Sequence, residues 1–337
     1  MAIETNRQFQ VTDAPAIPGL SFRGFQGETD YPKMVAIIQG CKEVDQIERV
    51  DSVEDVARFY THLHNCDPFL DMLFAEIQGE VVAYSRVSWR TELEGNQIYQ
   101  HFGFLLPAWR GKGIGRAMLR FNERHLEAIA ARNPAGAPRF LESFAADTEQ
   151  GAAALLLAEG YGAIRHNFHM LRPNLEAIPE APMPSGLEVR PVQPGHYQAI
   201  WDANMEAFQD HWGISPEAEP TLQEWLDDPN FDPCLWKVAW DGDQVAGMVL
   251  SFINARENRE YNRKRGYTEN ICVRRPWRKR GLAFSLLAQS LQALKERDMQ
   301  EAALGVDTQN LSGALRLYER AGFRPVKRFS TYRKPLE

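Results

Sequence analysis

The stretch that decides the fold is Arg110-Gly111-Lys112-Gly113-Ile114-Gly115, which lies between an apolar run and a predicted helix over 116–130. A related stretch, Arg278-Lys279-Arg280-Gly281-Leu282-Ala283, stands 168 residues later in the same setting. Small residues in both let backbone N–H groups approach phosphate oxygens, and the following helix presents its positive end to the same anion. A tight turn with solvated cations is the alternative for one such loop, but two equivalent loops favour phosphate binding.

The loops belong to a duplication that runs along the chain. Gly19-Leu-Ser-Phe-Arg23 resembles Gly186-Leu-Glu-Val-Arg190, and Gly160-Tyr161 resembles Gly322-Phe323, all in the same order. Collinear matches of this kind indicate a repeated domain. A proline-rich stretch near residue 180 suits an extended spacer. The sequence therefore predicts one domain over 1–175, a second over 186–337 and a linker over 176–185.

Composition excludes several classes of protein. The 337 residues allow two domains, and 44% hydrophobic with 25% charged residues is ordinary for a globular protein. A net charge of −7 argues against a nucleic-acid partner. No apolar run approaches the ~18 residues needed to span a bilayer, and the first residues do not read as a secretory signal. Four scattered cysteines without metal-ligand spacing favour a reducing cytoplasm and predict no metal site.

Each half has the same order of predicted elements. A short strand and helices come first, then a hairpin, which turns at Asp241-Gly242 in the second half. A strand, the glycine loop, a helix, a strand, a helix and a final strand follow. This mixed order predicts the α/β class, in its α+β variant, with a mixed sheet covered by helices.

These features resemble the GNAT acyltransferase superfamily. Its acetyl-CoA signature, Gln/Arg-x-x-Gly-x-Gly/Ala after a strand, is matched in both halves. Its late element is matched by Gly305-Val-Asp-Thr-Gln-Asn310 and Leu317-Tyr318-Glu-Arg-Ala-Gly322-Phe323. The resemblance covers nearly the whole chain, and the two-domain layout is similar to that of the mycothiol synthase group. It implies two tandem domains, each a mostly antiparallel mixed sheet flanked by helices.

The resemblance also implies that acetyl-CoA is the co-substrate. Backbone groups of Ile271, Cys272 and Val273 would pair with its pantetheine arm and stabilise charge on the thioester oxygen. Eight basic side chains over 263–280 could attract its phosphates or be solvated. The remaining positions implied to contact acetyl-CoA are Arg278, Lys279, Arg280, Gly281, Leu282, Ala283 and Asn310, with Leu105, Arg110, Gly111, Lys112, Gly113, Ile114 and Gly115 in the first half.

Acetyl transfer to an amine requires two proton movements. The amine must lose a proton to attack, and the departing CoA thiolate must gain one. Tyr318 occupies the family's general-acid position, although a tyrosine packed in a helix is the alternative. Glu269 lies on the strand that feeds the loop and is the candidate base, with a solvated carboxylate as the alternative. Asp307 is the reserve candidate, and a helix cap is its alternative role.

The acceptor region is less defined. His211 and Trp212 follow the early helices of the second half, a region that walls the acceptor site in this family. His211 could orient a substrate or titrate near neutrality. A packing pair at a helix end is the alternative.

The first half departs from the pattern where catalysis would occur. Counting back from Gly160 places Leu156 at the tyrosine position and Thr148 at the asparagine position. His101 lies nine residues before Arg110, as Glu269 lies nine before Arg278. Leucine cannot donate a proton, so we expect the first half to bind acetyl-CoA without turnover and the second half to be catalytic.

The sequence thus predicts an acetyl-CoA-dependent N-acetyltransferase acting on a primary amine of a small molecule. One alternative is a non-catalytic acetyl-CoA-binding regulatory protein. Another is an acetyltransferase of protein N-termini or lysines. No nucleic-acid, membrane or metal partner is expected, and the acceptor and oligomeric state stay open.

Overall fold

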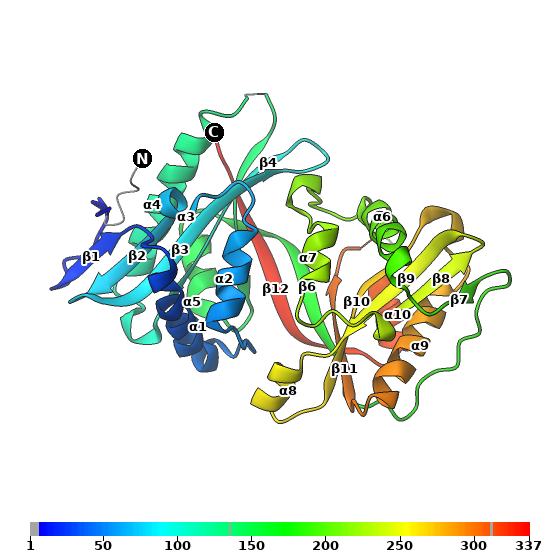
Figure 1. Ribbon diagram of the computed structural model, residues 1–337. Helices are drawn as coiled ribbons and strands as arrows, with labels where there is room; N and C mark the ends of the chain where they lie inside the picture. The colour runs from blue at the N-terminus through cyan, green and yellow to red at the C-terminus, as the bar shows by residue number, and fades with distance from the viewer. Residues whose placement is uncertain (1–6, 135, 311–312) are drawn as a thin grey trace. The chain divides into compact units, whose positions relative to one another are not determined.

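The computed structural model describes residues 7–134, 136–310 and 313–337, and the chain forms two compact units (Figure 1). The first unit comprises Met1–Ile164, Ser215–Ala218 and Ser330–Glu337. The second comprises Arg165–Ile214 and Glu219–Phe329. The expected linker at 176–185 lies within the second unit.

The first unit is built on a mixed sheet whose strands follow the chain order. Its strands are β1 (Leu20–Arg23), β2 (Met72–Ile77), β3 (Glu80–Thr91), β4 (Gln97–Leu105) and β5 (Arg139–Ala146), followed by the end of β12 (Arg324–Pro335). Strands β1 to β4 pair antiparallel, whereas β4 and β5 pair in parallel. Its helices are α1 (Tyr31–Asp45), α2 (Val53–Thr61), α3 (Pro68–Asp71), α4 (Ile114–Ala130) and α5 (Gln150–Ala158).

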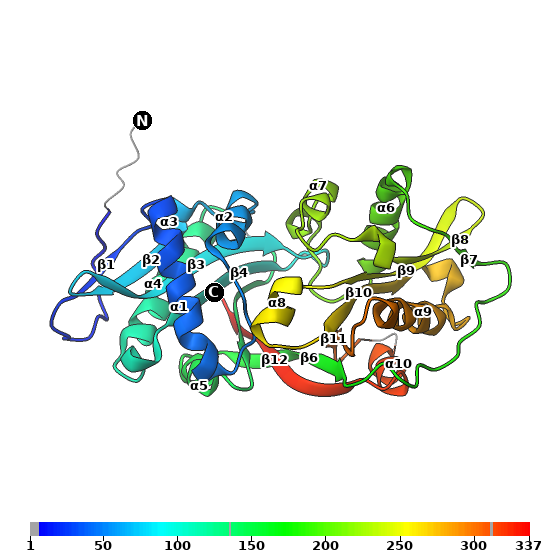
Figure 2. The ribbon, with the colours of Figure 1, turned by 60° about the horizontal axis from the view of Figure 1, so that its bottom comes forward.

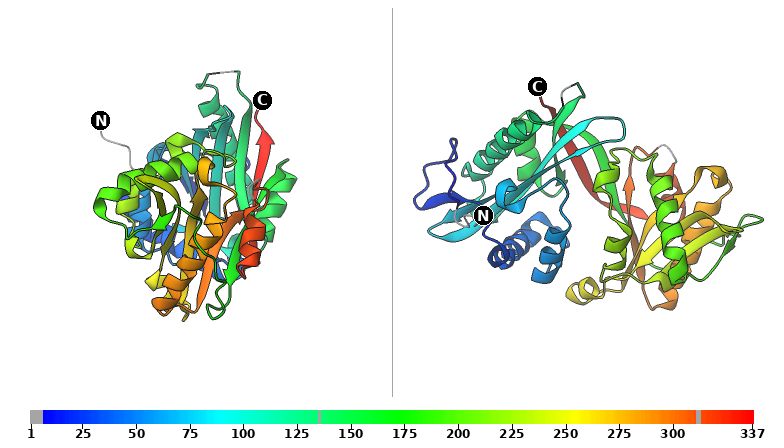
Figure 3. Two further views of the ribbon diagram at one scale, coloured as in Figure 1. Left: turned by 90° about the vertical axis from the view of Figure 1, so that its right-hand side faces the viewer. Right: turned by 45° about the horizontal axis from the view of Figure 1, so that its top comes forward.

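Helices cover both faces of this sheet. Phe102 and Phe104 of β4 pack in one cluster with α1 and α2. Tyr99, on the opposite face of β4, packs with α4 and α5. The right-hand view of Figure 3 shows α1 and α4 on opposite sides of the strands. This alternation follows from the two-residue period of a strand.

The second unit repeats the plan with its strands in the spatial order β12-β6-β11-β10-β9-β8-β7. Their bounds are β6 (Gly162–Arg172), β7 (Glu188–Val189), β8 (Lys237–Asp241), β9 (Gln244–Phe252), β10 (Arg265–Val273) and β11 (Glu301–Asp307). Of the registered pairs, only β10 with β11 is parallel. Its helices are α6 (Tyr197–Phe208), α7 (Leu222–Leu226), α8 (Ala255–Glu260), α9 (Leu282–Glu296) and α10 (Ala314–Arg320). Figure 2 shows α6 and α9 on opposite sides of β8 to β10.

Both units therefore confirm the predicted fold class, a mostly antiparallel mixed sheet flanked by helices. Short 3₁₀ turns complete them, at η1 (Glu28–Asp30), η2 (Pro107–Trp109), η3 (Pro194–His196), η4 (Pro216–Ala218), η5 (Pro233–Leu235) and η6 (Arg275–Trp277). The turns η2 and η6 stand at equivalent places, directly before the two glycine loops.

The final strands of the two sequence halves are exchanged between the units. Strand β6 ends the first half, yet its residues 167–172 pair with β11 in the second unit. The C-terminal residues 330–337 end the second half, yet they belong to the first unit. There the Leu336 N–H donates to the Arg139 carbonyl at 2.9 Å.

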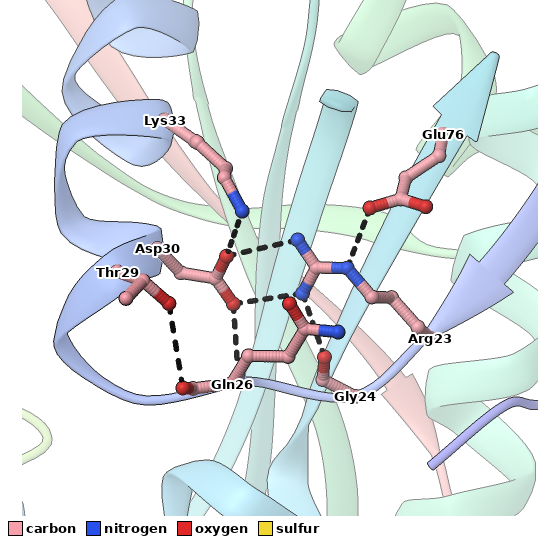
Figure 4. Close-up of polar contacts among 7 residues, drawn as sticks. All are labelled: Arg23, Gly24, Gln26, Thr29, Asp30, Lys33 and Glu76. Carbon is pink, nitrogen blue, oxygen red and sulfur yellow. Dashed lines mark hydrogen bonds and ion pairs between the residues drawn. The ribbon is translucent and has the colours of Figure 1, made fainter. Parts of the chain in front are cut away.

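A buried ion-pair cluster joins β1, β2 and the start of α1 (Figure 4). The Arg23 guanidinium donates to both Asp30 oxygens at 2.7 and 2.8 Å, and its Nε donates to Glu76 at 2.6 Å. Lys33 adds a contact to Asp30 at 2.8 Å. Such buried charges are tolerated because each one has a partner, so the cluster fixes where α1 leaves the sheet.

Candidate active site

The glycine loop of the second unit has the conformation of an anion cradle. Gly281, the N-cap of α9, has φ 85°, and Lys279 has φ 62°. Among the described residues, no backbone or side-chain acceptor meets the N–H groups of residues 279–283. Consecutive unpaired N–H groups at a helix start bind phosphate oxygens well.

The loop of the first unit has the same backbone shape. Gly111 has φ 72° and Gly113 has φ 91°, close to the values of Lys279 and Gly281. Its N–H groups over 111–115 also meet no acceptor in the described part of the chain. A Cβ built on Gly113 would lie 3.4 Å from Pro15, so the N-terminal segment packs against this loop.

The arginine that opens each loop contacts protein acceptors. Arg278 Nε donates to the Val273 carbonyl at 2.8 Å, and its Nη1 to Asp210 at 2.6 Å. Arg110 Nε donates to the Leu105 carbonyl at 2.9 Å, and its Nη atoms to Asp45 at 2.5 and 2.7 Å. Each guanidinium therefore ties its loop to the end of the strand before it.

Strand β10 separates from β11 beside the loop. Their pairing covers only residues 265–267 of β10 and 301–303 of β11. On the other side, the register of β10 with β9 shifts between Glu269 and Cys272, and Asn270 has φ 46°. This β-bulge bends the strand. Among the described residues, no strand pairs with the edge of Ile271–Val273 that faces β11, and the expected pairing with a pantetheine arm requires such a free edge.

Glu269 lies at the start of this opening and is buried. Burial raises the pKa of its carboxyl to about 7, although a hydrogen bond from the Gly305 backbone opposes the rise. Gly305 lies on β11 just past its paired residues. A carboxyl with a pKa near neutrality suits general-base work, because it is partly ionised and still accepts a proton readily.

Tyr318 of α10 is the residue that the sequence singles out as the candidate proton donor. Its side chain is only 6% exposed and packs beside Phe323, with ring centroids 6.4 Å apart. Burial raises the pKa of the phenol, and the charge of Glu269 raises it further. Tyr318 thus stays protonated at neutral pH. The structure brings together Glu269, Cys272 and Tyr318, three residues singled out from the sequence.

Asp307, the reserve base, is occupied in an ion pair. Arg165 Nε donates to its Oδ1 at 3.0 Å, and the Gln309 N–H donates to it at 3.0 Å. The Asn310 N–H donates to the Asp307 carbonyl at 3.2 Å, which turns the chain toward α10. These contacts leave Glu269 as the better-placed base.

His211 and Trp212 lie near this ion pair. The Arg165 guanidinium is 5.1 Å from the Trp212 ring centroid. The His211 ring stacks on Phe208 at 4.4 Å, and burial lowers the pKa of His211. His211 is therefore neutral at pH 7. Sequence reasoning missed Arg165, because it belongs to the first half of the chain.

The corresponding region of the first unit has a different register. Strand β4 pairs with β3 without a shift in register. Phe102 lies opposite Arg86, and the corresponding pair in the second unit is Glu269 opposite Leu250. The bulge of β10 adds one residue between Glu269 and the loop, and β4 has no such bulge. Counting nine residues back from Arg110 therefore goes one residue beyond the position that corresponds to Glu269. His101 is therefore not the equivalent of Glu269, so the match made by counting was wrong, whereas the expected alternative of a buried strand histidine agrees with the structure.

His101 instead belongs to a buried structural network. Its Nε2 lies 2.7 Å from the Tyr161 hydroxyl, which donates to Glu123 at 2.8 Å. Lys334 also donates to Glu123, at 3.0 Å. Burial lowers the pKa of His101 to about 4, so the ring is neutral. Leu156, at the tyrosine position, is buried as well.

A mixed sheet that opens beside a helix-capping glycine loop is the arrangement expected of an acetyltransferase of the GNAT class. The family model described as Acetyltransferase (GNAT) family matches residues 33–157 and 197–323. The chain belongs to this family and is an N-acetyltransferase of the GNAT type.

Relatives and solved structures agree with this placement. The chain is 31% identical to a mycothiol acetyltransferase of Salinispora tropica, covering 64% of this chain and 67% of the relative. It is 28% identical to a mycothiol acetyltransferase of Streptomyces bingchenggensis, covering 78% and 80%. A GCN5-related N-acetyltransferase from Sphaerobacter thermophilus has TM-score 0.71 and 27% identity over 94% and 95% of the chains. A tandem GNAT protein from the clavulanic acid pathway shares the fold, with TM-score 0.64 and 15% identity over 94% and 98%.

The described residues contain neither a membrane-spanning helix nor a metal-binding cluster of side chains. No helix in the described ranges is long and apolar enough to cross a bilayer. No group of three or more His, Cys, Asp or Glu side chains in the same ranges is placed to hold a metal ion. The four cysteines, Cys41, Cys66, Cys234 and Cys272, are free.

Proposed function

We propose that the second unit transfers the acetyl group of acetyl-CoA to a primary amine of a small molecule, with Glu269 as base and Tyr318 as acid. The observation that carries the proposal is the buried Glu269 carboxyl with a pKa of about 7, beside a buried tyrosine and an unpaired strand edge. Perturbed groups of this kind cluster at catalytic centres. The adjoining loop supplies unpaired N–H groups for the CoA phosphates.

The reaction proceeds by direct attack. The acceptor ammonium gives a proton to Glu269, and the neutral nitrogen attacks the thioester carbonyl carbon. N–H groups at the bulged part of β10 stabilise the negative oxygen that develops. The C–S bond then breaks, and Tyr318 gives its proton to the departing CoA sulfur. Glu269 then releases its proton to solvent, and the Tyr318 phenolate takes up a proton from solvent. Both groups thereby return to their starting protonation states.

The acceptor is a small molecule, and we propose a mycothiol-type cysteinyl amine as its class. The support is the name of the relatives, which are mycothiol acetyltransferases. Arg165, His211 and Trp212 form the neighbouring cluster that would contact the acceptor.

In the first unit we propose acetyl-CoA binding without turnover. Its loop has the same φ angles as the catalytic loop. Leucine at 156 and phenylalanine at 102 replace the acid and the base, so neither proton can move.

The proposal is tested by incubating the whole chain with acetyl-CoA and a panel of amines. The panel contains a cysteinyl amino sugar, a polyamine, an aminoglycoside and a lysine peptide. Thiol release and the mass of the acetylated product are measured. We expect release with the cysteinyl amine above the others and a mass gain of one acetyl group. Acetylation of the peptide alone, or no release with any amine, would overturn the proposal.

A further inference from the structure

Arg86 of β3 is a buried cation, and no carboxylate of the described residues forms an ion pair with it. Its side chain is only 8% exposed. Its Nε and Nη1 atoms are inaccessible to water, and no acceptor among the described residues meets them. Buried ionic donors without partners are costly, so proteins rarely retain one for packing alone.

Three aromatic rings surround the guanidinium. Its central carbon lies 4.8 Å from the ring centroid of Phe102, 5.0 Å from that of Phe59 and 5.3 Å from that of Tyr60. Ring faces stabilise the cation, but they do not satisfy N–H donors that point outward in the guanidinium plane. The Tyr60 hydroxyl is also buried and meets no hydrogen-bond partner in the described part of the chain. Arg86 and Tyr60 are therefore two buried polar groups that lie side by side, and the Arg86 charge acts on the pKa of the Tyr60 phenol and of the nearby Cys66 thiol.

The carboxylates of the neighbouring elements are already occupied. Asp55 of α2 accepts from Ser52 and Arg58. Asp67 caps α3, and Asp71 lies 2.7 Å from His125. None of them forms an ion pair with Arg86.

The position of Arg86 in the fold is informative. Arg86 on β3 lies opposite Phe102 on β4. The corresponding pair in the second unit is Leu250 on β9 opposite Glu269 on β10. The first unit thus has a cation and an aromatic ring where the second unit has its base.

We propose that Arg86 and Tyr60 form a binding site in the first unit for a small monocarboxylate with an apolar body. A planar carboxylate matches the guanidinium fork, and one negative charge matches one cation. The apolar body would lie on Phe59 and Phe144, which are 56% and 49% exposed and stand at the border of the aromatic cluster. A phosphate dianion would need a second cation there. This site is independent of the proposed acetyl transfer.

The test measures binding by calorimetry on the whole chain, without acetyl-CoA. The probes are phenylacetate and isovalerate, with phenylacetamide as the neutral control and inorganic phosphate as the competing anion. We expect one phenylacetate per chain, at least tenfold weaker binding of phenylacetamide and no binding of phosphate. Arg86→Met keeps the length of the side chain and should weaken phenylacetate binding at least tenfold. Tyr60→Phe should weaken it several-fold, whereas Arg58→Met, on the same helix as Tyr60, should leave it unchanged.

A stability measurement separates a ligand site from a structural arginine. In the ligand-free protein, Arg86→Met removes unpaired buried donors, so we expect its melting temperature to rise. Phenylacetate should raise the melting temperature of the original chain and not that of the variant. The proposal is overturned if neither carboxylate binds, if Arg86→Met binds as well as the original chain, if phosphate binds in preference, or if Arg86→Met lowers the melting temperature.

Discussion

We assign the proposed base role to Glu269 because its surroundings change its acidity. A carboxyl in water has a pKa near 4.3 and is a weak base at neutral pH. Burial raises the pKa of Glu269 to about 7, and the Gly305 backbone keeps the side chain in one place. The same burial keeps Tyr318 protonated. One environment therefore prepares both an acceptor and a donor of protons.

Glu269→Gln should remove the acidic limb of the pH–rate profile. The base works only when ionised, so kcat/KM of the original chain should fall about tenfold per pH unit below pH 7 and level off above it. The variant should lose roughly 10²–10⁴ in rate and show no limb near pH 7. Asp307→Asn is the control and should retain the limb. A limb that persists in Glu269→Gln and vanishes in Asp307→Asn would identify Asp307 as the base.

Single residues were predictable from the sequence only where a motif fixed them. Tyr318 and Glu269 stand at set distances from Gly322 and Arg278, so the motifs singled them out as candidates. His101 was misplaced because the extra residue in the β10 bulge is invisible to counting. The sequence around Arg86 contains no motif that marks it, because its burial away from acceptors is visible only in the folded structure.

At the scale of elements, the bulge in β10 distinguishes this strand from β4, its counterpart in the first unit. Strand β4 pairs with β3 without interruption up to Leu105, whereas β10 changes register after Glu269. Asn270 absorbs the change in a left-handed conformation with φ 46°, which asparagine tolerates better than most residues.

Asn270→Val should damage the site, and Asn270→Gly should preserve it. A β-branched side chain is strained at φ 46°, at a cost of about 1–2 kcal/mol. We expect Asn270→Val to lower the free energy of unfolding by that amount and kcat by about tenfold. Urea unfolding and steady-state kinetics measure both. Equal behaviour of the two variants would show that the bulge does not place Glu269.

The two glycine loops offer a matched pair of charge reversals. Arg280 and Lys112 occupy equivalent positions, 168 residues apart. Reversal of one partly exposed charge costs about 1 kcal/mol, or about fivefold in affinity. Arg280→Glu should raise KM for acetyl-CoA about fivefold. Lys112→Glu should weaken the second acetyl-CoA seen by calorimetry and leave KM unchanged. A rise in KM with Lys112→Glu alone would reverse the roles of the loops.

Elements themselves were largely predictable. Alternating apolar residues and the Asp241-Gly242 turn located the β8–β9 hairpin, and the glycines located the starts of α4 and α9. The opening between β10 and β11 was not predictable from the residues alone, because strand pairing depends on distant partners.

At the scale of the whole chain, the exchanged final strands join the two sequence halves. Arg333, near the C-terminus, contacts Glu92 and donates to Glu142 at 2.8 Å inside the first unit. All three side chains are buried. A repeat in sequence therefore does not correspond to a separable unit in space, and a cut near residue 180 would remove a strand segment from each unit.

Arg333→Met should destabilise the first unit strongly. It removes the close cationic partner of buried Glu92, which keeps only the Asn96 amide at 3.0 Å and Arg90 at 3.9 Å, whereas Glu142 still accepts from Arg90 at 2.7 Å. Breaking a buried ion pair in this way costs about 3–5 kcal/mol. Arg297→Met is the control, because its ion pair with Asp232 is half-exposed and contributes less than about 1 kcal/mol. Urea unfolding of both variants measures the difference. Similar stabilities would mean that the C-terminal segment does not hold the first unit together.

The duplication and the fold class were predictable, since repeated landmarks and turn signals are local. The exchange of the final strands was not predictable, because the sequence pattern of a final strand is the same whichever sheet the strand joins. Arg165 enters the second unit through this exchange and pairs with Asp307. Part of the candidate acceptor region therefore could not be predicted when each sequence half was considered separately.

The central claim is that acetyl transfer takes place in the second unit alone, with Tyr318 as the acid. The most direct measurement compares kcat of Tyr318→Phe with that of Tyr161→Phe, a buried tyrosine of the first unit, at saturating acetyl-CoA. We predict a fall of about 10²–10⁴ for Tyr318→Phe with little change in KM for acetyl-CoA, and a normal kcat for Tyr161→Phe. A normal rate for Tyr318→Phe beside an inactive, folded Tyr161→Phe would contradict the account.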